Sequence, residues 1–130
     1  MRPNGRIRFW HSETHELAPG ITLIRCGGHF AGGSALHWAD GAGGRGVLCS
    51  ADLATVNMDR KSFTFMRSYP NMIPLSPRQV EAIGATLEPF AFDRAYSHFF
   101  EPMIPTGAKQ ILRNSVARYV GACHGAYDAD

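Results

Sequence analysis

Two residues of types that bind metal ions stand directly after apolar segments of this 130-residue sequence. His29 follows a pair of glycines, which in turn follow an apolar run at residues 21–24. Asp52 closely follows a second apolar run, at residues 47–48. Imidazole and carboxylate groups are ligands that suit a zinc or iron centre. The pattern therefore indicates a candidate metal ligand at each of two loops. In a plainer alternative the two side chains only cap adjacent turns.

Short β-strands are needed to place these two residues at loop positions. Segments 21–25, 34–38 and 46–50 carry short apolar or alternating runs near glycines, so we expect strands there. Glycines on both sides of His29 allow the sharp turn and the positive φ that put a side chain at the end of a strand. Alternation of charged and apolar residues predicts a further strand at residues 6–10.

The clearest helix signal begins at Ser76. A serine cap, a proline at the first helical position and Gln79 in a capping box predict a helix over residues 77–88. A strand is expected at residues 92–96, and a second helix at residues 107–120, ended by the glycine that follows it. The residues expected to face the core from the two helices are Val80, Ile83, Leu87, Ile111, Leu112, Ser115, Val116, Tyr119 and Val120.

Three other histidines are interpreted as structural or surface residues. His37 alternates with apolar neighbours inside a predicted strand, so its side chain points to one face of the sheet. His11 and His15 lie four positions apart, as zinc-binding histidines on a helix do, but the glutamate between them is in the wrong place. We therefore expect residues 11–20 to form a polar connection between strands.

Aromatic, methionine and arginine side chains cluster in the segment 58–75. Arg67 and Tyr69 are the candidates to hold an anionic or carbonyl substrate there, because arginine forms paired hydrogen bonds to such groups. Two prolines, Pro70 and Pro74, break any regular element that continues from this cluster. An extended loop packed by its own aromatic residues gives the same pattern, so both interpretations stand.

The segment GGHFAGGSALHW, followed by LCSAD, resembles the second half of a metallo-β-lactamase-fold hydrolase domain. The likeness continues through DRKSFTFMRSYPNMIPL and FDRAYSHFFEPMI into SVARYV, and so covers nearly the whole chain. It is similar to a bacterial subgroup of that superfamily whose members carry such an MRSYPN segment. The resemblance implies an α/β fold that is one half of an αββα sandwich, with a mixed sheet covered by two helices.

The resemblance also implies a metal site. His29 corresponds to the family's histidine after the glycine pair, Asp52 to the carboxylate that bridges two metals, and His98 to the histidine that closes the second metal's shell. In the family pattern that last histidine usually precedes a glycine, whereas Phe99 follows it here. The implied cofactor is zinc, with iron or manganese as alternatives, and one or two ions once the domain is complete.

One part of the family pattern is missing. The first metal motif, a His-x-His-x-Asp-His run, is absent from the sequence, and no other residue replaces it. Residues 1–121 therefore resemble the C-terminal half of a domain that is normally about twice as long, with residues 122–130 as a tail. Three protein ligands and a water are nevertheless enough for a catalytic zinc site.

Composition bounds the class of protein. A hydrophobic content of 45% and a charged content of 18% fit one ordered globular domain. The net charge of +2, with mixed signs and no basic stripe, gives no reason to expect a nucleic acid partner. Three cysteines without C-x-x-C spacing do not indicate a disulfide framework. No apolar run approaches the roughly 20 residues of a membrane span. We therefore expect a cytoplasmic protein that does not bind membranes.

Two functions remain open. The first is a zinc-type hydrolase domain that is incomplete without the first metal motif. The second is a non-catalytic half-domain, or remnant, that acts as an association partner. In both cases we expect self-association or pairing with a missing N-terminal half, because a sheet covered by helices on one side leaves an apolar face exposed. The sequence does not identify the small-molecule substrate or the bond that is hydrolysed.

Overall fold

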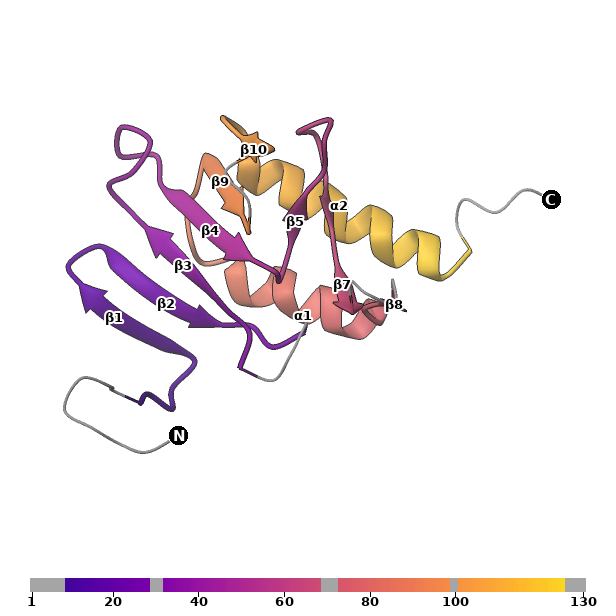
Figure 1. Ribbon diagram of the computed structural model, residues 1–130, viewed down its shortest axis with the longest axis horizontal. Coiled ribbons are helices and arrows are strands. Elements are labelled where there is room, and N and C mark those ends of the chain that lie inside the picture. The colour runs from indigo at the N-terminus through magenta and orange to yellow at the C-terminus, as the bar shows by residue number, and fades with distance from the viewer. Residues whose placement is uncertain (1–8, 29–31, 69–72, 99–100, 126–130) are drawn as a thin grey trace.

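The computed structural model describes residues 9–28, 32–68, 73–98 and 101–125 (Figure 1). Its main element is a six-stranded mixed sheet with the strand order β1-β2-β3-β4-β9-β10. Neighbouring strands are antiparallel except for β4 and β9, which run parallel. The strands of this sheet are β1 Thr14–Ala18, β2 Ile21–Arg25, β3 Ser34–Trp38, β4 Val47–Ala51, β9 Arg94–Ser97 and β10 Met103–Ile104.

Four shorter strands and two helices complete the described part of the chain. They are β5 Thr55–Val56, β6 Phe63–Thr64, β7 Met66–Ser68, β8 Ile73–Pro74, α1 Pro77–Leu87 and α2 Ala108–Cys123. β5 pairs with β6, and β7 with β8, each in an antiparallel pair. α1 and α2 pack against each other, as Figure 1 shows. β6 contacts α2.

The two helices cover one face of the sheet. Ile24, Leu48 and Ala95 point from three strands into a buried core. The same core contains Ile83 of α1 and Leu112 of α2. Burying one aliphatic side chain contributes roughly 1.5–3 kcal/mol, so this shared core holds the helices on the sheet. The fold is therefore α/β, with a mixed sheet and two helices, as the sequence predicts.

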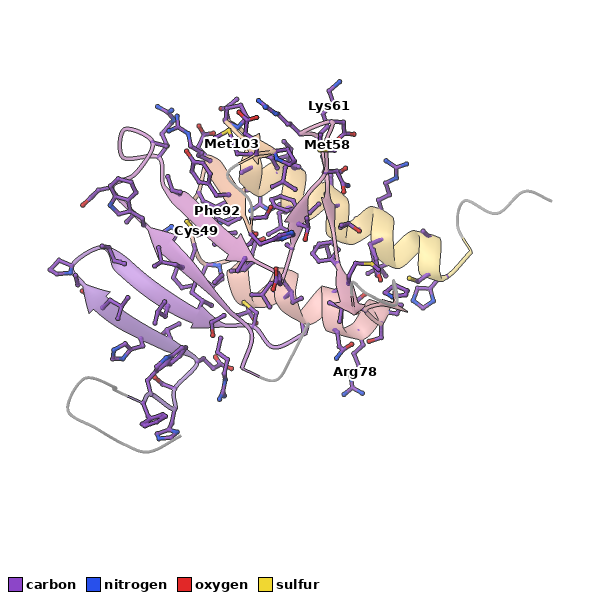
Figure 2. All side chains as sticks on the ribbon, in the orientation of Figure 1. Cys49, Met58, Lys61, Arg78, Phe92 and Met103 are labelled. Carbon is purple, nitrogen blue, oxygen red and sulfur yellow. The ribbon has the colours of Figure 1, made fainter. Side chains whose placement is uncertain are left out.

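The opposite face of the sheet is only half-buried. Strand register aligns one row of side chains across all six strands: His15, Leu23, Leu36, Cys49, Tyr96 and Met103. Each member of the row is half-exposed, in contrast to the buried residues on the helix-covered face. Cys49 and Met103 of this row are labelled in Figure 2. We call this surface the open face.

The predicted strands at the centre of the sheet are confirmed. β2 and β3 occupy the predicted segments 21–25 and 34–38. β4 is displaced by one residue from the predicted segment 46–50, and β9 begins two residues later than the predicted segment 92–96. Short apolar or alternating runs therefore locate these strands to within one or two residues at their starts, with glycines on both sides of β2 and β3.

Both helices also lie where the sequence predicts them. α1 begins with the expected capping box, in which the Ser76 side chain accepts a hydrogen bond from the amide of Gln79. Val80, Ile83 and Leu87 form the buried side of α1, as expected from their spacing. Neither described helix is long and apolar enough to cross a membrane.

α2 continues beyond its predicted end. The helix runs to Cys123, whereas the sequence predicts a stop at Gly121 and a tail over residues 122–130. Gly121 lies within the helix. A glycine inside a helix is about 1 kcal/mol less favourable than an alanine, and the helix tolerates this cost. Gly125, with a φ of +80°, is the glycine that leaves the helical conformation after the helix.

The edge of the sheet differs from the prediction. The polar connection expected over residues 11–20 is wrong in part, because Thr14–Ala18 forms strand β1 and pairs antiparallel with β2. Most of β1 is exposed, so its sequence lacks the apolar alternation of a half-buried strand. The strand predicted at residues 6–10 lies mainly outside the described residues, and no strand is assigned to residues 9–10.

Asp93 joins three segments at the start of β9. Its carboxylate accepts hydrogen bonds from the Gly107 amide at 2.8 Å, from Arg45 Nε at 2.8 Å and from the Thr106 hydroxyl at 3.0 Å. Gly107 is the N-cap of α2 and has no side chain of its own, and the first helical amide, of Ala108, donates instead to the backbone carbonyl of Asp93 at 3.0 Å. The hydrogen bond from Gly107, followed by that from Arg45, lowers the pKa of Asp93 below its ordinary value.

This lowered pKa predicts a pH-dependent contribution to stability. The contribution of Asp93 is present above its unfolded-state pKa, about 4, and is lost as the pH falls through the lower folded-state pKa. We expect Asp93→Asn to be less stable than the wild type at neutral pH, and the difference to shrink in acid. Urea unfolding at stepwise lower pH measures the difference. If the difference in free energy of unfolding between the wild type and Asp93→Asn stays constant into strong acid, the lowered pKa of Asp93 is not its cause.

Candidate functional site

Three strands of the sheet have their C-terminal ends on the same side of the sheet. We call this side the C-terminal edge, as distinct from the edge strand β1. β2 runs antiparallel to β3, β3 antiparallel to β4, and β4 parallel to β9, so β2, β4 and β9 point in one direction. Gly28 follows the end of β2, Asp52 follows β4 and His98 follows β9. Loops at strand ends hold functional side chains on a rigid scaffold. The topology therefore gathers the loops in which the sequence predicts metal ligands.

Asp52 and His98 contact each other directly at this edge. Nδ1 of His98 lies 3.3 Å from Oδ1 of Asp52. The His98 side chain is 23% exposed and the Asp52 side chain 49%, so the pair is open to solvent. The structure thus brings together two of the three residues that the sequence predicts as metal ligands. The third, His29, lies outside the described residues, and its expected convergence with Asp52 stays a prediction.

A tight turn at the end of β4 holds Asp52. Ala51 has a φ of +49°, in the left-handed region that alanine rarely adopts. The amide of Leu53 donates to the carbonyl of Ser50 at 3.1 Å, which closes the turn around Asp52. The buried Ser50 hydroxyl donates to the carbonyl of Ala54 at 2.5 Å. These contacts restrict the direction in which the Asp52 side chain leaves the backbone.

Two serine hydroxyls connect this turn, and strand β5 after it, to the strand that precedes His98. Ser50 Oγ lies 3.3 Å from the carbonyl oxygen of Tyr96 in β9. Ser97 Oγ accepts a hydrogen bond from the amide of Val56 at 3.2 Å. Neither serine is singled out by sequence reasoning, because a serine near a strand end is common and carries no sign of a distant partner.

The 3.3 Å separation of Asp52 and His98 fits two chemical arrangements. Two ligands bonded to one tetrahedral zinc at ~2.0–2.1 Å stand about 3.3 Å apart. The same separation suits an imidazole that is oriented by a carboxylate for proton transfer. Within the described ranges, no three histidine, cysteine, aspartate or glutamate side chains gather to form a metal-binding group. A complete metal shell therefore needs a ligand from outside those ranges, and His29 has the right chemistry.

The glycines before His29 have the predicted conformation. Gly27 and Gly28 have φ values of +68° and +84°, which residues with a Cβ rarely adopt. A Cβ at Gly28 would stand only 2.8 Å from Cδ1 of Ile83 in α1. Burial raises the pKa of the Cys26 thiol, just before these glycines, to about 12.

The predicted substrate-binding residues stay untested. Arg67 lies in β7, where only its backbone is described, and Tyr69 lies outside the described residues. Phe65, just before this segment, is fully buried and contacts the ring of Tyr119 edge-on at 5.5 Å between centroids. Phe65 is therefore packed by another aromatic ring, as the loop interpretation expects. Substrate binding by Arg67 or Tyr69 stays a prediction.

His37 has the structural role that its alternating position predicts. It is 7% exposed, and its Nε2 atom lies 2.7 Å from the carbonyl oxygen of Ala91. Its ring also packs on the ring of Phe90, with 5.1 Å between centroids. His37 therefore fastens the loop before β9 to the sheet and is not placed to bind a metal.

Two cavities lie away from the Asp52–His98 pair. One has a volume of about 330 Å³ and lies between α1 and α2. The other, of about 460 Å³, opens on the open face and is lined by Trp38, Ala42, Gly43, Arg45, Val47, Cys49, Arg94 and Tyr96. Neither cavity includes Asp52 or His98 in its lining, so neither is a substrate pocket for that pair.

The chain is similar to a bacterial protein. The uncharacterized protein YmaE of Bacillus subtilis (strain 168) is 43% identical over 121 residues, which cover 93% of this chain and 44% of the relative. The chain thus spans less than half the length of the relative that it matches. No family model matches the sequence, and no solved structure matches it.

Proposed function

We propose that this chain is the metallo-β-lactamase-like C-terminal half of a metal-dependent hydrolase domain, in which Asp52 and His98 bind zinc together with His29. One observation carries the proposal. Two residues selected as metal ligands from the sequence alone lie 3.3 Å apart at one sheet edge. Imidazole and carboxylate are usual zinc ligands, and three protein ligands with a water suffice for a catalytic site.

The open face supports the larger architecture of this proposal. In a sandwich, two sheets pack face to face at about 10 Å and bury rows of side chains such as the one across the open face. The Bacillus relative is more than twice as long as the matched region, which leaves enough length for a second layer. The proposed second layer covers the open face and carries the missing first metal motif.

Each residue has its own task in the proposed site. A bound zinc ion would polarise the substrate and lower the pKa of a bound water, with iron or manganese as alternative metals. Asp52 supplies negative charge from a turn that restricts its direction. His98 would supply a ring nitrogen beside the Asp52 carboxylate, at the separation expected for two ligands of one zinc. Arg67 and Tyr69 would hold an anionic or carbonyl oxygen of the substrate.

Zinc titration tests the proposed site. We expect the isolated chain to bind zinc weakly. Asp52→Asn, His98→Gln and His29→Gln should each weaken binding by at least about 10- to 100-fold, which is the loss typical of residues that only orient a ligand. Competition with a chromophoric chelator measures the affinity, and elemental analysis measures the metal content. Because the first motif is missing, we expect little or no hydrolysis by the isolated chain.

The matched control is His15→Gln. His15 lies in the edge strand β1 and its ring stacks on that of Trp10, with 5.9 Å between centroids. This variant should bind zinc as the wild type does. Absence of zinc from the wild type when the metal is supplied, or unchanged affinity in Asp52→Asn, would contradict the proposal.

A non-catalytic half-domain that acts as an association partner is the second candidate. The open face favours it, because a half-exposed row across six strands suits a protein interface whether or not a metal binds. The two candidates differ in metal content. Association by a chain that binds no zinc supports the second candidate, whereas zinc binding that depends on Asp52 and His98 supports the first.

A further inference from the structure

The Ser50 hydroxyl is a buried polar group at the junction of the two segments that carry the candidate ligands. Ser50 has no exposed surface and stands two residues before Asp52, in strand β4. Its Oγ atom donates to the carbonyl of Ala54, beyond Asp52, at 2.5 Å. The same atom lies 3.3 Å from the carbonyl of Tyr96, two residues before His98. One hydroxyl therefore contacts the backbone on both sides of the site.

The backbone beside Ser50 is strained in a way that calls for such a restraint. Ala51 occupies the left-handed region with a φ of +49°, although alanine has a Cβ that disfavours it. Strained conformations persist only where the surrounding contacts over-determine them. The contacts around Ala51 include the Ser50 hydroxyl, the hydrogen bond from the Leu53 amide to the Ser50 carbonyl, and the pairing of Ala51 with Ser97. Loss of the hydroxyl leaves the strained turn with fewer restraints.

We infer that Ser50 is a positioning residue, whose hydroxyl fixes the turn that aims the Asp52 carboxylate at His98. Its effect on metal binding rests on the proposed function, but its effect on the Asp52–His98 contact does not. Partners outside the ligand shell commonly tune metal affinity by about 10- to 100-fold, because they orient the ligands. A serine that only filled core space would influence stability without changing the geometry of the pair.

Ser50→Ala and Ser115→Ala form a matched test. Ser115 is also buried, and its hydroxyl accepts a hydrogen bond from the amide of Phe63 at 2.9 Å, in a part of the core that holds no candidate ligand. Both variants should lose stability, because both remove a buried hydrogen bond. Only Ser50→Ala should also alter the imidazole nitrogen chemical shifts of His98 in the zinc-free chain and weaken zinc binding by about 10-fold.

The nuclear magnetic resonance measurement needs no metal, so it separates this inference from the proposed function. Altered His98 shifts in Ser50→Ala, in a chain whose wild type binds no zinc, would support the positioning role and contradict the metal site. Unchanged His98 shifts in a folded Ser50→Ala chain would overturn the positioning role. Equal shifts in Ser50→Ala and Ser115→Ala would overturn it as well.

Ala51→Gly keeps the inference testable even where Ser50→Ala does not fold. Glycine adopts a positive φ without the Cβ penalty and leaves the Ser50 hydroxyl in place. If the hydroxyl positions Asp52, the His98 shifts should stay close to those of the wild type and the zinc affinity should change by less than about twofold. Loss of the wild-type His98 shifts in Ala51→Gly would show that backbone stiffness, and not the hydroxyl, sets the geometry.

Discussion

Replacing Gly46 by alanine is expected to remove much of the stability of the fold. Gly46 has a φ of +93°, and a Cβ atom at this position would stand 2.0 Å from the carbonyl oxygen of Ala91. That oxygen belongs to the backbone, so it cannot move aside as a flexible side chain does. Strain at such a φ costs about 1–3 kcal/mol, and overpacking costs about 1–3 kcal/mol more. A typical domain is stable by only about 5–15 kcal/mol.

The position of Gly46 also bears on the site. Its carbonyl accepts hydrogen bonds from the amides of Asp93 at 2.9 Å and Arg94 at 3.3 Å. These contacts set the approach of β9 to β4 at the start of their parallel pairing. Because Asp52 and His98 follow the ends of those two strands, the close backbone approach at Gly46 is a condition for their contact.

Gly44→Ala separates the steric clash with Ala91 from the backbone strain of a positive φ. Gly44 has a φ of +89°, close to that of Gly46, but an added Cβ meets no atom within 4 Å. We expect Gly44→Ala to cost only about 1–2 kcal/mol. Urea unfolding of both variants measures the difference. Equal losses in the two variants would show that the contact with Ala91 is not the cause.

The elements that pack against the helices could be predicted because their sequences carry strong local signals. A capping box at Ser76 and a buried stripe at helical spacing locate α1 to within one residue of its observed end. Apolar runs beside glycines locate β2 and β3. β1 escaped prediction because an exposed edge strand has no apolar pattern. Its position depends on pairing with β2, which local sequence does not record.

The candidate site could be predicted in its residue types but not in its geometry. Asp52 and His98 were selected from their resemblance to a family pattern, and their contact depends on the parallel pairing of β4 with β9. That pairing joins two strands separated by β5 to β8 and α1, and local sequence does not record which distant strand is the partner. Ser50 and Ala51 were missed for the same reason, since a buried hydroxyl and a left-handed alanine are set by tertiary contacts.

The open face is expected to be a surface through which the chain associates. Its row of half-exposed side chains crosses all six strands, and Leu36 lies near the middle of that row. A second sheet layer would bury Leu36, and association with another copy of the chain would bury it as well. A hot-spot residue near the centre of an interface costs about 2–4 kcal/mol when it is truncated. Such a loss corresponds to roughly 30- to 1,000-fold in affinity.

We therefore expect the wild-type chain to self-associate at micromolar concentration and Leu36→Glu to weaken this association by about 30-fold or more. The control is Met58→Glu, because Met58 is 84% exposed, lies between β5 and β6 (Figure 2) and is not a member of the row on the open face. It removes an exposed apolar side chain without changing the open face and should associate as the wild type does. Sedimentation velocity measures the association, and circular dichroism checks that Leu36→Glu stays folded, which is expected because Leu36 is half-exposed. A wild-type chain that is monomeric at these concentrations, or equal weakening by both substitutions, would mean that the open face is a solvated surface and that no second layer is needed to cover it.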